Sequence, residues 1–138
     1  MAVGLKVKFY WYQIGTGDFL HSFFSTIAYN LEDAKWGTKY PYLMKKLYSG
    51  ILKEGYLKNA KEELEIIKSE LKIIPVSEVI WDIDDLSKPI PWGDNISPDI
   101  TDLSNYFITS DGDDLITVIQ HALDKAMELK SDITIESI

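Results

Sequence analysis

The residues best placed to do chemistry lie between positions 78 and 93, in the stretch EVIWDIDDLSKPIPWG. A short apolar run, residues 79–81, is followed at once by Asp82, Asp84 and Asp85. A buried strand that ends in an acidic loop is a common way to build a site, and also a common way to end a strand. The sequence alone is compatible with both interpretations.

One chemical interpretation is a small metal-dependent hydrolase. The order Asp82-Ile83-Asp84 is similar to the aspartate pair of phosphoryl-transferring phosphatases, which use one aspartate as nucleophile and the next as acid/base, with Mg²⁺ between carboxylates. The hydroxyl or valine usual after the second aspartate is missing, and too little sequence follows for the rest of that fold. A hydrolase that uses Asp82, Asp84 and Asp85 is therefore kept as the alternative to a binding function.

A second acidic group is formed by Asp111, Asp113 and Asp114, around Gly112. It lacks the acid and glycine spacing of an EF-hand loop, including the distal glutamate. Carboxylates are favourable at the positive end of a helix dipole, and an apolar helical pattern begins at Leu115. Helix capping is the better interpretation, and no metal site is predicted.

The two histidines, His21 and His121, each fall within a predicted helix and have no second histidine or cysteine at ligand spacing. A partly buried, hydrogen-bonded histidine is expected on each helix. Ser22 and Ser25 lie in no nucleophile elbow. These histidines and serines are therefore not predicted to be catalytic, and no cofactor is predicted.

The charge of the chain is unevenly divided. All 14 basic residues are lysine, and the formal net charge is −8. Residues 1–72 carry 11 lysines and 8 acids, whereas residues 73–138 carry 3 lysines and 14 acids. An acidic half repels nucleic acid and anionic membranes and favours a basic partner. Without cysteine, a signal-peptide pattern or about 18 consecutive apolar residues, the expected protein is soluble and cytoplasmic.

Periodicity predicts the elements that must position these groups. Residues 3–14 alternate and then become aromatic, which predicts a strand that is central in its sheet. Asp18 is a good N-cap for a helix over residues 18–33. Residues 40–49 predict a short helix with proline near its first turn, and residues 56–74 the clearest amphipathic helix.

The rest of the chain alternates between loop, strand and helix signals. Residues 78–81 and 105–109 are predicted strands, residues 82–102 a proline-rich loop, and residues 115–129 a helix. Residues 132–138 predict an edge strand or a loose tail. Together these predict one α+β domain over residues 1–138, with a small, mostly antiparallel sheet packed against about four helices.

Many short segments of this chain resemble the immunity protein 70 family of bacterial polymorphic toxin systems, from about Phe19 to about Ala126. The matching segments are Asn30–Glu32, Trp36-Gly37, Tyr40-Pro41, Leu47–Gly50, Glu63-Leu64, Ile80–Asp82, Pro91–Gly93, Tyr106–Thr109 and Asp111–Leu115. The resemblance implies a protein that binds and neutralises a cognate toxin domain and has no enzymatic activity of its own.

A nuclease toxin would present a basic active site, which an aspartate-rich inhibitor can occupy. Aromatic side chains beside desolvated acids are also typical of binding hot spots. The hypothesis is therefore a toxin-binding face, without nucleic-acid or membrane partners. Its predicted members are Asp82, Asp84, Asp85, Trp92, Asp94, Asp111, Asp113 and Asp114.

Overall fold

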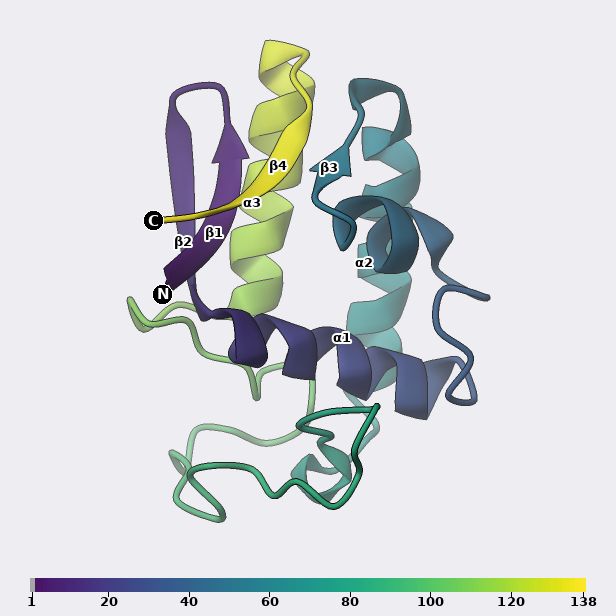
Figure 1. The fold of residues 1–138 in the computed structure, drawn as a ribbon, viewed down its shortest axis with the longest axis vertical. Helices are drawn as coiled ribbons and strands as arrows, with labels where there is room; N and C mark the ends of the chain where they lie inside the picture. Colours follow the sequence, from purple (N-terminus) through teal and green to yellow (C-terminus); the bar gives the residue numbers. More distant parts are fainter. Residues whose placement is uncertain (1) are drawn as a thin grey trace.

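The computed structural model describes residues 2–138 and has an α+β architecture with a four-stranded antiparallel sheet (Figure 1). The strands are β1 (Ala2–Val7), β2 (Tyr10–Thr16), β3 (Ile51–Leu52) and β4 (Ile133–Ser137). Their order across the sheet is β2-β1-β4-β3, and each neighbouring pair is antiparallel. The predicted fold class is confirmed.

Three α-helices and three short helical segments complete the structure. They are α1 (Gly17–Leu31), the π-helix η1 (Tyr42–Leu47), the 3-10 turns η2 (Glu54–Tyr56) and η3 (Val76–Glu78), α2 (Leu57–Leu71) and α3 (Leu115–Leu129). Helices α2 and α3 pack side by side, α3 also contacts β1 and β2, and α1 runs crosswise below them (Figure 1). The predicted inward side chains of α2 from Leu57 to Leu71 are buried.

The predicted single strand over residues 3–14 is wrong, because the chain turns back on itself at Lys8 and Phe9. Lys8 has a left-handed φ of 52°, and the Phe9 side chain at the tip is 97% exposed. Two-residue hairpin turns usually carry asparagine, aspartate or glycine, and none stands here. The aromatic part is the edge strand β2, while β1 is central between β2 and β4.

Three smaller predictions also need correction. Residues 78–81 and 105–109 form no strand: Glu78 ends η3, and Ile108 makes only an isolated bridge with Asp114. The N-cap of α1 is Thr16, whose side chain accepts from the Phe19 amide, and Asp18 lies in the first turn. The segment predicted as an edge strand or a tail is β4, which lies inside the sheet between β1 and β3.

Two buried carboxylates hold the chain between α1 and η1. Glu32, at the end of α1, accepts hydrogen bonds from the amides of Gly37, Lys39 and Tyr40, each at 2.9 Å. Glu63 on α2 accepts from the amide of Leu43 at 2.9 Å. Buried backbone donors must be paired, so these carboxylates determine the path of a segment that belongs to no sheet.

Replacing Glu32 with glutamine should therefore destabilise the fold. A carboxamide has one acceptor oxygen and turns an NH₂ group toward amides that need an acceptor, so we expect a loss of about 1–3 kcal/mol in the free energy of unfolding. Urea denaturation measures this, with Glu62→Gln on the exposed face of α2 as the matched control. Equal stability of the two variants would contradict the assigned role of Glu32.

Candidate functional site

Helix α1 presents a row of buried hydroxyl groups to the segment that follows η3. Ser22, Ser25 and Thr26 are at most 1% exposed, and their spacing places them on one face of the helix. Ser22 Oγ donates to the Ile80 carbonyl at 2.7 Å, and Ser25 Oγ accepts from the Ile83 amide at 3.2 Å. Thr26 Oγ1 accepts from the Ile80 amide at 3.0 Å and also contacts the Ile80 carbonyl at 3.1 Å. These hydroxyls supply the partners that a neighbouring strand would otherwise supply.

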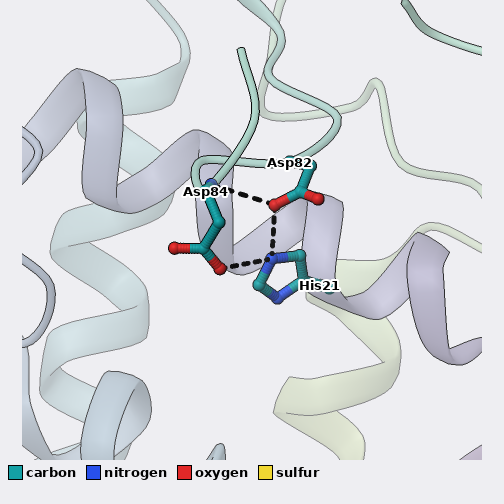
Figure 2. A group of neighbouring side chains, drawn as sticks. All are labelled: His21, Asp82 and Asp84. Carbon is teal, nitrogen blue, oxygen red and sulfur yellow. Dashed lines mark hydrogen bonds and ion pairs between the residues drawn. The ribbon is translucent and has the colours of Figure 1, made fainter. Parts of the chain in front are cut away.

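His21 stands beside this row and contacts the acidic loop (Figure 2). Its Nε2 lies 3.2 Å from Asp82 Oδ1 and 3.8 Å from Asp84 Oδ2, and its Nδ1 lies 2.6 Å from the Tyr48 hydroxyl. Asp82 also accepts from the Asp84 amide at 2.9 Å and from Lys88 Nζ at 3.1 Å. The side chain of Asp82 is 17% exposed and that of Asp84 is 83% exposed. Asp82 therefore organises the loop, whereas Asp84 faces solvent.

The protons in this cluster can be placed from its electrostatics. The hydrogen bond from the Asp84 amide, followed by the bond from Lys88, holds the pKa of Asp82 below its ordinary value despite partial burial. Burial, with the charges of Asp84 and Asp82, raises the pKa of the Tyr48 hydroxyl. Asp82 is thus an acceptor and Tyr48 a donor, so a neutral His21 carries its proton on Nε2 and accepts from Tyr48 at Nδ1.

One nitrogen of His21 and one oxygen each of Asp82 and Asp84 lie within 4.8 Å of one another, which is a possible ligand set for a metal ion. In this arrangement, however, both oxygens of Asp82 already have partners: Oδ1 accepts from His21 and from the Asp84 amide, and Oδ2 accepts from the Lys88 ammonium. A metal ion at Asp82 would have to displace these donors. Asp82 also follows no strand. The alternative of a phosphatase-like hydrolase therefore gains no support from this geometry.

Trp92 and Asp94 lie further along the same loop. Trp92 Nε1 donates to the Tyr106 hydroxyl at 2.8 Å, and the Trp92 ring packs edge-on against Trp81 with centroids 5.6 Å apart. Asp94 is exposed, and its charge adds to the effect of burial in raising the pKa of Tyr106. A partly buried aromatic pair therefore stands next to an exposed carboxylate.

The second acidic group lies at the start of α3. Asp114 is the N-cap, with its Oδ2 accepting from the Thr117 amide at 3.1 Å, so the prediction of helix capping is confirmed for this residue. Asp111 and Asp113 are exposed and line a cavity of about 300 Å³ with His121. His121 is exposed, so the prediction of a partly buried, hydrogen-bonded histidine is right for His21 and wrong for His121.

The structure distributes the eight predicted site residues over three places. Asp82, Asp84 and Asp85 lie beside α1, Trp92 and Asp94 beside Tyr106, and the remaining three at the α3 N-terminus. Between residues 2 and 138, no hydrogen bond or ion pair links the first group to the third. Sequence reasoning missed Tyr48, Lys88 and the α1 hydroxyl row. The signal for that row was present, since polar residues at 22, 25 and 26 share one face of a helix whose other central residues, from Phe23 to Ala28, are apolar.

Comparison with protein families decides what kind of protein carries this arrangement. The family model described as Immunity protein 70 matches residues 5–135 of the 138. The chain belongs to the immunity protein 70 family. Its members are immunity proteins of toxin systems, which act with a cognate toxin protein. No curated protein and no solved structure matches the chain.

Across the described residues, no helix of this immunity protein is long and apolar enough to cross a membrane.

The electrostatics of the Asp82 cluster lead to a test by titration. Since the folded pKa of Asp82 is depressed, its stabilising effect is present above the unfolded-state pKa of about 3.9 and is lost as the pH falls through the folded value. Lys88→Met should raise the pKa of Asp82 toward 3.9, because it removes one of the two main causes of the shift. Carboxyl ¹³C shifts followed by NMR between pH 2 and 6 measure this.

The control variant is Lys125→Met, since Lys125 pairs with Glu128 on α3 and should leave the titration of Asp82 unchanged. A pKa for Asp82 at or above 3.9 in the unmodified protein would show that the described contacts do not stabilise its charge.

Proposed function

We propose that this immunity protein binds and neutralises a toxin domain through an acidic face, and that the toxin surface it covers is basic, as in a nuclease. The protein acts by occupying that surface in the cytoplasm, where a nuclease would reach its substrate, and carries out no turnover itself. The proposed face includes the exposed carboxylates at its centre, while Asp82 and Asp114 hold the two loops in place. Its exposed members are Asp84, Asp85, Asp94, Asp111 and Asp113.

The observation that carries this proposal is a surplus of carboxylates, from Asp94 to Asp114, that form no ion pair among the described residues. Residues 89–124 contain seven acids and no lysine or arginine. In the described part of the chain, no lysine lies within ion-pair distance of the six aspartates from Asp94 to Asp114. Uncompensated like charges oppose folding, and a basic partner offsets that repulsion and speeds association.

The test is a charge-reversal series against the cognate toxin domain. The variants are Asp84→Lys with Asp85→Lys, and Asp111→Lys with Asp113→Lys. Glu62→Lys with Glu65→Lys serves as a control of equal charge change on the exposed face of α2. We expect each face variant to lower the association rate about tenfold or more at low salt, and to weaken its dependence on salt concentration, because steering acts through unscreened charge.

Protection in co-expression should fall with the association rate in the face variants and persist in the control. If both face variants protect cells as well as the unmodified protein and keep its salt dependence, the acidic face is not the binding surface. If the unmodified protein does not bind the toxin domain at all, the proposed partner is wrong.

A further inference from the structure

A shallow apolar groove lies in the long loop that α1 supports. It has a volume of about 370 Å³. Its apolar walls come from the first turn of α1 and from the loop. They are formed by Phe19, Trp92, Ile96, Ile100, Tyr106 and Ile108.

The walls of this groove are held by contacts with one another and with the core behind them. The polar edge of Trp92 is satisfied by the Tyr106 hydroxyl, and Phe19 packs edge-on against Phe107 with centroids 5.8 Å apart. Tyr106 is 5% exposed, whereas Ile108 at the rim is 41% exposed. The groove is therefore built in advance, and a ligand that enters it orders few additional side chains.

A second hollow of about 410 Å³ adjoins this groove and shares Ile96 and Tyr106 with it. Asp94 and Ile90 lie on its lining. Together the two hollows form a continuous apolar surface on the loop, and the Asp94 carboxylate lies at its margin. Apolar anchor sites ringed by polar groups are the typical centre of protein–protein interfaces.

The negative charge around the groove determines which kind of protein segment can bind there. Asp94, Asp99 and Asp102 belong to the same loop, and Asp18 directly precedes Phe19. No lysine occurs between residues 88 and 125, and the lysines that act on these acids are Lys72, near Asp102, and Lys88, near Asp18, so carboxylates outnumber cations here. An acidic or phosphorylated segment would be repelled here. An apolar side chain flanked by lysine or arginine would bury its apolar part in the groove and place its cations against the carboxylates.

We infer that this groove receives an aliphatic or aromatic side chain of the toxin, flanked by lysine or arginine residues. This inference rests on the proposed function and adds to it the anchor point of the complex. The carboxylates then act mainly on the rate of association, whereas the groove acts on the lifetime of the complex.

The experiment measures binding of the cognate toxin domain by biolayer interferometry at 0.5 M NaCl, where steering by exposed charges is screened. Ile108→Arg places a long cation across the groove from a rim position that is already exposed. Ile66→Arg is the matched control, since Ile66 is 51% exposed and lies beside Glu62 and Glu65 on α2, away from the groove. We expect at least a tenfold faster dissociation for Ile108→Arg and less than a twofold change for Ile66→Arg.

A second blocking variant covers the case in which Ile108→Arg fails to fold. Asn95 is exposed and lines the groove, so Asn95→Arg should also speed dissociation tenfold while keeping the near-UV circular dichroism of the unmodified protein. Unchanged dissociation in the folded groove variants overturns the inference, and leaves the proposed function intact if the unmodified protein binds. Equal effects of Ile108→Arg and Ile66→Arg overturn it as well.

Two further outcomes, self-association through the groove and absence of toxin binding, can be told apart in the same experiments. If the unmodified protein sediments as a dimer that Ile108→Arg dissociates without any change in toxin binding, the groove is a self-association surface and the inference is wrong. If the unmodified protein shows no toxin binding, the proposed function fails and the inference fails with it.

Discussion

The structure depends on the pairing of a partly buried backbone segment with side chains of α1. Residues 78–83 pass against α1, and among the described residues no strand pairs with them, so their amides and carbonyls need other partners. Ser22, Ser25 and Thr26 supply the missing donors and acceptors, and Asn30 Nδ2 donates to the Glu78 carbonyl at 3.0 Å. A partly buried amide or carbonyl without a partner is unfavourable, so this row determines where the chain leaves the core.

The same helix organises the acidic loop from a second direction. His21 contacts Asp82 on one side and Tyr48 on the other, and Tyr48 directly follows η1. The buried carboxylate of Glu63 accepts from the Leu43 amide within η1, and that of Glu32 accepts from the Tyr40 amide just before it. Side chains of α1 thus connect the loop after η3 to the segment around η1, although the two are far apart in the sequence. Both carboxylate oxygens of Asp82 are engaged in these contacts, whereas Asp84 and Asp85 face solvent.

Much of the fold could be predicted because local patterns dictate it. The stripe from Leu57 to Leu71 predicts α2, and Asp114 before Leu115 predicts the start of α3. The hairpin at Lys8 and Phe9 could not be predicted from the sequence, since neither residue is common in tight turns. Residues 78–81 have strand-like composition, but whether an extended segment pairs with a strand or with hydroxyls depends on tertiary contacts. For the same reason the sequence predicted the acids of the site but not that they lie in three places.

The central claim is that the α1 hydroxyls, rather than strand pairing, hold the segment that carries Asp82. Amide hydrogen exchange at Ile80, measured by NMR, tests this most directly in Thr26→Val and Thr26→Ser, since valine removes the hydroxyl with little change of shape and serine keeps it. We expect Ile80 to exchange at least ten times faster in Thr26→Val, with Leu5 of β1 unchanged and Thr26→Ser close to the unmodified protein. Unchanged exchange at Ile80 in Thr26→Val, or equal acceleration in both variants, would contradict the account.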